Sequence, residues 1–160
     1  MMKTSFLARA GIIAALYAVL TLALPFIGFG PIQLRIAEAL CVLPFFMKDA
    51  VPGLFIGCLA ANAIGMAFGL TTPWDIVIGS LATLIAAYMS SRIRHEWLVP
   101  LPSVIVNALV IGTMLTLVYT PGTGIVPLLY NIGTVAAGQV LSCYLLGMPL
   151  LKLLKKYKWS

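Results

Sequence analysis

The stretch IQLRIAEALCVLPFF at residues 32–46 places an arginine and a glutamate three positions apart among apolar residues. The chain around it has 160 residues, of which 62% are hydrophobic and only 9% are charged, and its mean hydropathy is +1.09. Such a composition leaves too little polar surface to cover a water-soluble globule. We therefore expect an integral membrane protein, in which ionisable residues such as Arg35 and Glu38 are functional candidates.

Apolar segments recur along the chain, separated by proline, glycine and charged residues. The second segment is short, because only about a dozen apolar residues follow Arg35 where a membrane span needs roughly 20. It would have to be tilted, or shielded by neighbouring helices. We predict an all-α integral membrane protein with a single transmembrane domain over residues 1–160. It would form a compact bundle of six transmembrane helices, at about 6–24, 33–47, 51–68, 74–91, 98–119 and 126–146.

The basic residues predict the orientation, because cytoplasmic loops carry an excess of lysine and arginine. With the N-terminus inside, every basic residue except Arg35 falls on the cytoplasmic side, and so do both termini. The net charge of +6 then follows from a multi-pass topology in the cell membrane and from contact with the lipid bilayer, and it is no argument for nucleic acid. The residues on that side are Lys3, Arg9, Lys48, Arg92, Arg94, Lys152, Lys155, Lys156 and Lys158.

Sequence motifs of catalysis and cofactor binding are missing. The chain has no phosphate-binding loop of the GxxxxGK[ST] type, no HExxH pair and no GxSxG elbow with a histidine at membrane depth, so we expect no enzyme and no cofactor or metal on this chain. The N-terminal apolar stretch lacks a signal cleavage site and is expected to remain as the first helix. Cys41, Cys58 and Cys143 lie in apolar segments without paired spacing, so we interpret them as small core residues.

Polar side chains are predicted to gather in the outer half of the membrane. Counting about 1.5 Å per helical residue places one set at the same depth as the Arg35–Glu38 pair, and Asn107 and Gln139 deeper, near the middle. Such residues either line a pocket for a small polar molecule or hold helices together, and Arg35 and Glu38 could also simply satisfy each other. The outer set comprises Arg35, Glu38, Asn62, Trp74, Asp75, Tyr130 and Asn131.

The first predicted helix carries a stripe of small residues. Ala10, Ala14 and Ala18 recur every four positions, and Gly11 and Ala15 widen the stripe. Small residues at this spacing let a second helix approach closely in lipid. The stripe therefore predicts either a docking surface for a partner protein or internal packing within the bundle.

Three ordered segments resemble a known family: IQLRIAEALCVLPFF, GLFIGCLAANAIG at 53–65 and WDIVIGSLATLIAA at 74–87, together with ARAGIIAALY at 8–17. They are similar to the QueT family, the substrate-binding S components of energy-coupling factor (ECF) transporters proposed to carry queuosine precursors. The C-terminal half resembles the family only loosely. The resemblance implies that the first helix docks on a transmembrane coupling subunit and that two partner ATPase subunits use ATP.

Ligand chemistry follows as a hypothesis from this resemblance. A 7-deazaguanine presents two parallel N–H donors, which the Glu38 carboxylate could accept together. Arg35 would orient Glu38 or donate to the ring carbonyl, and Asp75 beside Trp74 would suit an aminomethyl group on the ligand. Trp74 or Tyr130 could stack on the ring.

Three rival functions remain open from the sequence. An S component for a different vitamin or nucleobase-like ligand would keep the fold and change the pocket. A small proton-coupled transporter working through Glu38 would need no partner. An intramembrane enzyme is disfavoured by the missing motifs.

Overall fold

The computed structural model of the chain describes residues 4–28, 34–122 and 124–157, and all the regular secondary structure in these ranges is helical. The all-α prediction is confirmed. The elements in chain order are α1 (Thr4–Ala23), α2 (Pro25–Gly28), η1 (Ile36–Phe45), α3 (Ala50–Ala67), η2 (Asp75–Gly79), α4 (Ser80–Ser90), η3 (Glu96–Leu98), α5 (Leu101–Tyr119), α6 (Ile125–Val140), η4 (Leu141–Leu146) and α7 (Gly147–Lys156).

Within the described residues, four helical stretches are long and apolar enough to cross a membrane. They follow the predicted segments closely, and α6, η4 and α7 join into the last of them. Two further apolar helical stretches are shorter, so the count of six spans and the orientation of the termini stay predictions. The four long stretches are Thr4–Ala23, Ala50–Ala67, Glu96–Tyr119 and Ile125–Lys156, and the shorter ones are Ile36–Phe45 and Asp75–Ser90.

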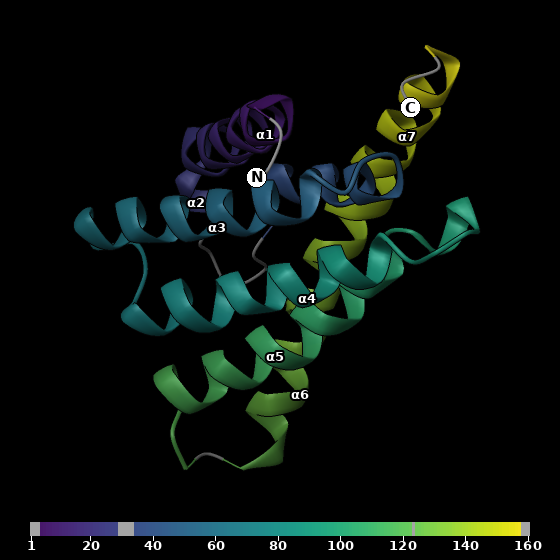
Figure 1. Ribbon diagram of the computed structural model, residues 1–160. Helices are drawn as coiled ribbons and strands as arrows, with labels where there is room; N and C mark the ends of the chain where they lie inside the picture. Colours follow the sequence, from purple (N-terminus) through teal and green to yellow (C-terminus); the bar gives the residue numbers. More distant parts are fainter. Residues whose placement is uncertain (1–3, 29–33, 123, 158–160) are drawn as a thin grey trace.

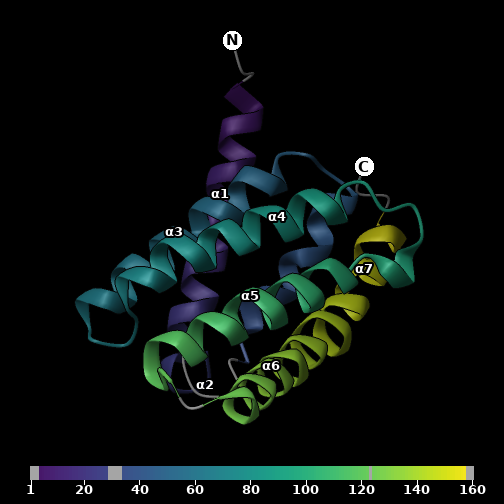
Figure 2. The same cartoon turned by 90° about the horizontal axis from the view of Figure 1, so that it is seen from below.

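The helices form a layered bundle. Helix α4 packs between α3 and α5, as both views show (Figures 1 and 2). Helix α6 packs on α5, and α1 packs on the other side of α3. Every residue of α1 that is buried faces this bundle, while much of the rest of α1 is exposed as expected for a surface in contact with lipid.

The short segment η1 lies at the centre of the bundle. It contacts α1, α3, α4, η4 and α7, and all of its residues from 37 to 44 are buried. Of the two explanations expected for a short apolar segment, the structure therefore shows shielding by neighbouring helices. A 3-10 helix rises about 2.0 Å per residue, so ten residues extend about 20 Å, further than the same residues would in an α-helix.

Small residues bring α1 and α3 into close contact. A Cβ atom built on Gly57 would lie 2.7 Å from Tyr17 Cβ and 2.8 Å from the Ala14 carbonyl oxygen, and one on Gly53 would lie 2.9 Å from the Ala10 carbonyl oxygen. These distances are too short for any side chain. The four-residue spacing of small residues on both helices thus fixes the α1–α3 packing.

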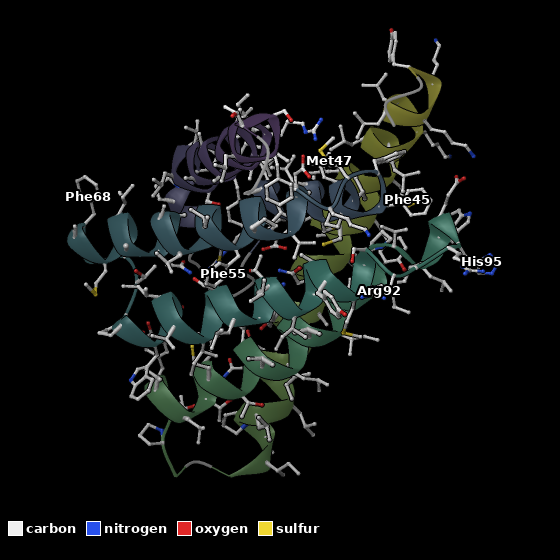
Figure 3. The ribbon with its side chains drawn as sticks, viewed as in Figure 1. Phe45, Met47, Phe55, Phe68, Arg92 and His95 are labelled. Atoms are coloured by element: carbon white, nitrogen blue, oxygen red, sulfur yellow. The ribbon has the colours of Figure 1, made fainter. Side chains whose placement is uncertain are left out.

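Charged residues gather at one end of the bundle. Ion pairs join Arg9 to Asp49, across α1 and the start of α3, and Lys155 to Glu96, across α7 and η3. In Figure 3 the labelled Arg92 and His95 lie toward the same end as Met47 and Phe45, whereas Phe68 lies at the opposite end. This arrangement agrees with the shared side predicted for the basic residues.

Candidate functional site

The Glu38 carboxylate is held by a residue from another helix. Tyr17 on α1 donates a hydrogen bond from its hydroxyl to Glu38 Oε1 at 2.5 Å, and both side chains are buried, with 1% and 3% of their surface exposed. A carboxylate has about four lone-pair positions. The Tyr17 hydrogen bond therefore leaves acceptor capacity on Glu38 for another donor.

Arg35 lies at the start of η1 and is directed toward other groups. Its Nε donates to the carbonyl oxygen of Gly28 at 3.2 Å, and its Nη1 lies 4.0 Å from Cys58 Sγ on α3. The hydrogen bonds described for Arg35 and for Glu38 thus go to different partners. Their side chains do not serve only to satisfy each other.

Cys58 on α3 is the meeting point of several donors. Its sulfur accepts from Asn62 Nδ2 at 3.4 Å and lies 3.3 Å from the Thr83 hydroxyl on α4. The Asn62 amide also donates to the Asp75 carbonyl oxygen at 2.9 Å. Among the described residues, the Asn62 side-chain oxygen has no hydrogen-bond partner, although Asn62 is fully buried. A buried acceptor of this kind is costly unless something donates to it.

A second set of polar groups, on η4, α6 and α5, contacts η1 at Glu38. The Cys143 thiol on η4 lies 3.6 Å from the Glu38 carbonyl oxygen and 3.4 Å from Gln139 Oε1 on α6. Gln139 in turn accepts from Asn107 Nδ2 on α5 at 3.2 Å, and all of these side chains are buried. The set around Cys58 and the set around Glu38 are joined through the backbone of η1, where the Glu38 N–H donates to the Arg35 carbonyl oxygen at 3.0 Å. We call the two sets together the polar network: Tyr17, Arg35, Glu38, Cys58, Asn62, Thr83, Asn107, Gln139 and Cys143.

Comparison with protein-family models places the chain in a known family. The family model described as QueT transporter matches residues 7–156, which include every member of the polar network. The chain belongs to the QueT transporter family. The match covers the C-terminal half as well, where the sequence alone suggested only a loose resemblance.

A curated relative agrees with the assignment to the QueT family. The chain is 37% identical over 86 residues to a protein of Lactococcus lactis subsp. cremoris (strain MG1363) named "Queuosine precursor transporter QueT". The aligned part is 52% of this chain and 47% of that relative, so it spans about half of each protein. No solved structure gives a significant match to the chain.

In this QueT family member, Asp75 has a structural role at a helix start. Its Oδ2 accepts from the backbone N–H of Thr72 at 2.8 Å and from the Thr72 hydroxyl at 2.7 Å. A carboxylate three residues after the capping residue commonly binds back to that residue's N–H, as in a capping box. Asp75 therefore stabilises the start of the η2–α4 segment, and it meets the polar network through its carbonyl oxygen.

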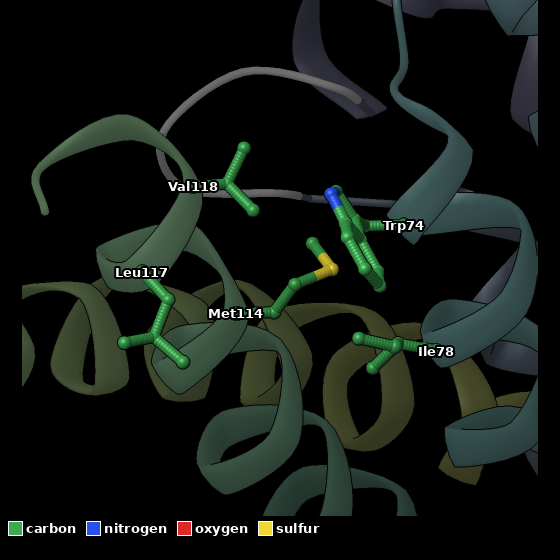
Figure 4. Close-up of a pocket in the computed structure, with 5 residues that line it drawn as sticks. All are labelled: Trp74, Ile78, Met114, Leu117 and Val118. Carbon is green, nitrogen blue, oxygen red and sulfur yellow. The ribbon is translucent and has the colours of Figure 1, made fainter.

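The aromatic candidates of the QueT chain lie elsewhere. Trp74 lines an apolar pocket of about 430 Å³ together with Ile78, Met114, Leu117 and Val118 (Figure 4). Tyr130 is 65% exposed, and Asn131 donates to the Thr116 hydroxyl at 3.0 Å, which joins α6 to α5. The structure therefore does not bring Trp74, Tyr130 or Asn131 into the polar network.

The small-residue stripe of α1 divides into two faces. Ala10 and Ala14 are buried against Gly53 and Gly57 of α3, so in this structure these two residues take part in internal packing. Gly11 and Ala15 are exposed, and Ala18 is half-buried. The outward face of the predicted docking surface is thus reduced to Gly11, Ala15 and the edge formed by Ala18.

Four members of the network were missed from the sequence: Tyr17, Cys58, Thr83 and Cys143. Tyr17 follows Ala10 and Ala14 at helical spacing, which placed it on the buried stripe, and a tyrosine buried in a membrane helix needs a partner for its hydroxyl. Cys58 and Cys143 are buried and reduced, as expected for small core residues. Their additional role as hydrogen-bonding links has no signature in residue spacing.

Proposed function

We propose that this protein is the membrane-embedded substrate-binding subunit of an ATP-driven ECF-type importer, and that it captures a queuosine precursor of the 7-deazaguanine class. Membership of the QueT family and the name of the Lactococcus relative support the transport of such a precursor. The observation that carries the proposal is the buried polar network, in which acceptors and donors gather around η1 inside the bundle.

The acceptors of the network fit the donor edge of a 7-deazaguanine. Glu38 is buried with acceptor capacity beyond the Tyr17 hydrogen bond, and the Asn62 side-chain oxygen has no partner among the described residues. The ring N1–H and the exocyclic amino group of the ligand would donate to Glu38 in a bidentate way. Donation to the Asn62 oxygen would offset the cost of its burial.

Donors of the network would recognise the opposite edge of the ring. Arg35 carries a guanidinium with five N–H donors, and its described contacts go to the Gly28 carbonyl oxygen and to the Cys58 sulfur. Another of these donors would reach the ring carbonyl of the ligand. The Asn107–Gln139 pair would form the floor of the site or tie α5 to α6, as its hydrogen bond already does.

Energy coupling requires partners, and the outward face of α1 is our candidate for the docking surface. Gly11 and Ala15 are exposed there, and the exposed side chains of Ile12 and Leu16 flank them. Ile12 and Leu16 also border a groove of about 290 Å³ between α1, η1 and α7, which is lined by apolar side chains and by Arg9. A helix of the transmembrane coupling subunit would pack on this face, and two ATPase subunits would supply the energy.

Native mass spectrometry of the purified protein, with ligand carried through purification or added as a 7-deazaguanine, tests the binding proposal. We expect one bound molecule of 7-deazaguanine mass, and weaker binding of vitamins with no such donor edge. Retention of a chemically unrelated ligand would reject the deazaguanine assignment. Uptake by this chain alone in ATP-free vesicles would reject the ECF mechanism in favour of a proton-coupled transporter.

A further inference from the structure

A basic hollow lies at the charged end of the bundle, apart from the polar network. It has a volume of about 580 Å³ and lies between the start of α3, the end of α4 and the turn that follows α4. Lys48, Arg92 and Arg94 contribute three cationic side chains to its lining. The remaining lining residues are Val51, Pro52, Tyr88, Ser91 and Ile93.

No acidic side chain neutralises these cations. The chain has four acidic residues, all within the ranges that the structure describes, and none of them lines the hollow. Two are engaged in ion pairs with cations outside the hollow, and two are buried within the bundle. The pairs are Asp49–Arg9 and Glu96–Lys155, and the buried residues are Glu38 and Asp75. The positive charge of the hollow would therefore attract an anion from outside the chain.

One guanidinium of the hollow contacts a neighbouring aromatic side chain. Arg92 Nη2 donates to the Tyr88 hydroxyl at 2.8 Å, and its guanidinium carbon lies 5.0 Å from the centre of the Tyr88 ring. A planar guanidinium held in this way keeps donors that match two oxygens of one phosphate group. Arg94 and Lys48 bring further positive charge to the same hollow.

The surroundings favour a lipid over a soluble anion. The hollow lies where α3 begins and α4 ends, which is the depth of the headgroups for helices that cross a bilayer. Leu81, Ile85 and Tyr88 follow one another at helical spacing on α4, and all are about half exposed. This apolar stripe leads away from the hollow along the membrane-facing side, where an acyl chain would lie.

We propose that this hollow binds the phosphate headgroup of an anionic phospholipid. Arg92, held by Tyr88, contacts the phosphate oxygens, Arg94 and Lys48 supply additional charge, and the acyl chains follow the exposed stripe of α4. Basic pockets between helix ends are a known form of anionic lipid recognition. The bound lipid would hold the α3 start, the α4 end and the turn after α4 together.

The test compares two double variants that lose the same charge. R92Q/R94Q removes two cations of the hollow, and K152Q/K156Q removes two exposed cations of the α7 tail as the control. Each purified protein is titrated with phosphatidylglycerol or phosphatidylcholine in native mass spectrometry, and its melting temperature is measured with the same lipids. Inorganic phosphate is added in a separate series to probe a soluble anion.

We expect the parent protein to retain phosphatidylglycerol in preference to phosphatidylcholine. At roughly fivefold in affinity per cation, R92Q/R94Q should bind phosphatidylglycerol about 30-fold more weakly, while K152Q/K156Q stays close to the parent. If R92Q/R94Q does not fold, the single variants Lys48→Gln and Tyr88→Phe replace it, each with a severalfold loss expected. Equal losses in the two double variants, equal retention of both lipids, or stabilisation by inorganic phosphate that competes with the lipid would overturn the proposal.

Discussion

The hydroxyl of Tyr17 on α1 donates to the carboxylate of Glu38 on η1 at 2.5 Å, in a part of the bundle where both side chains are buried. The same helix α1 packs through Ala10 and Ala14 on α3, which carries Cys58 and Asn62. Helix α1 therefore both packs closely on α3 and orients the Glu38 carboxylate through Tyr17. A change in the α1–α3 contact should therefore be felt at Glu38.

Tyr17→Phe tests this link directly. The change removes one donor from a buried carboxylate and keeps the ring volume, so we expect a loss of about 1.5 to 3 kcal/mol in stability, typical of a hydrogen bond to a charged group. Deazaguanine affinity should also fall, because Glu38 loses its fixed direction. Thermal melting without ligand and ligand titration measure the two effects.

Tyr130→Phe is the matched control for this change, because the Tyr130 side chain is 65% exposed. It should melt and bind like the parent protein. If Tyr17→Phe also behaves like the parent in both measurements, the Tyr17–Glu38 hydrogen bond does not position the carboxylate.

Two adjacent alanines of α1 separate internal packing from docking. Ala14 is buried against Gly57, so Ala14→Leu must push α1 from α3 and should lower the melting temperature, with a cost of about 1 to 3 kcal/mol for overpacking. Ala15 is exposed, so Ala15→Leu should leave melting and ligand binding unchanged. If α1 docks on the coupling subunit, Ala15→Leu should nevertheless reduce co-purification with that subunit and uptake of the ligand.

The exposed positions Ala15 and Gly11 also give a result that would contradict docking through α1. Normal co-purification of Ala15→Leu and of a bulky change at Gly11 would show that the outward face of α1 is not the docking surface. The assay uses this chain together with the coupling and ATPase subunits of the proposed complex.

Asp75→Asn asks whether this carboxylate binds ligand as well as capping its helix. Its Oδ2 accepts from Thr72, so the change should cost roughly 1 kcal/mol of stability, as the loss of a helix cap does. Affinity for a 7-deazaguanine without a charged substituent should be unchanged. An aminomethyl derivative should lose affinity only if its ammonium group contacts Asp75, and calorimetric titration of both compounds distinguishes these outcomes.

The sequence predicted the helical class, the segment bounds and most of the polar network, because composition and spacing determine where apolar helices begin and end. Arg35, Glu38, Asn62, Asn107 and Gln139, which the sequence predicts as candidate site residues, are all buried in the bundle. Helical spacing shows which residues share a face but not which face meets a neighbour. For this reason the stripe of α1 could not be divided, and Trp74 and Tyr130 could not be placed.

The hydrogen-bonding partners were harder to predict than the network members. Arg35 and Glu38 are three residues apart, which suggested a mutual pair, but their described hydrogen bonds reach Gly28 and Tyr17. Contacts between residues far apart in the chain depend on how the neighbouring helices enclose η1. Residue spacing within one segment does not predict this arrangement. The same holds for Cys143, which lies beside Glu38 although 105 positions separate them.

Glu38→Gln separates a binding role from an architectural one. Glutamine keeps a side-chain oxygen that can accept from Tyr17, so folding without ligand should change little. It cannot accept two parallel donors from a deazaguanine edge, and its amide nitrogen faces a ligand donor instead. A buried donor left without its acceptor costs about 1 to 3 kcal/mol, which corresponds to roughly a fivefold to 150-fold loss of affinity.

The double variant with Arg35→Gln completes the comparison. If Glu38 serves mainly to balance the charge of Arg35 in the bundle, Glu38→Gln should lower the melting temperature without ligand, and the double variant should restore it, because no buried charge then lacks its counterpart. If Glu38 binds the ligand, the double variant should bind no better than Glu38→Gln, whatever its stability. Deazaguanine titration and apo melting of both single variants and the double variant decide between the two. Parent-like affinity together with a lower melting temperature for Glu38→Gln would show that the carboxylate is part of the architecture and not of the binding site.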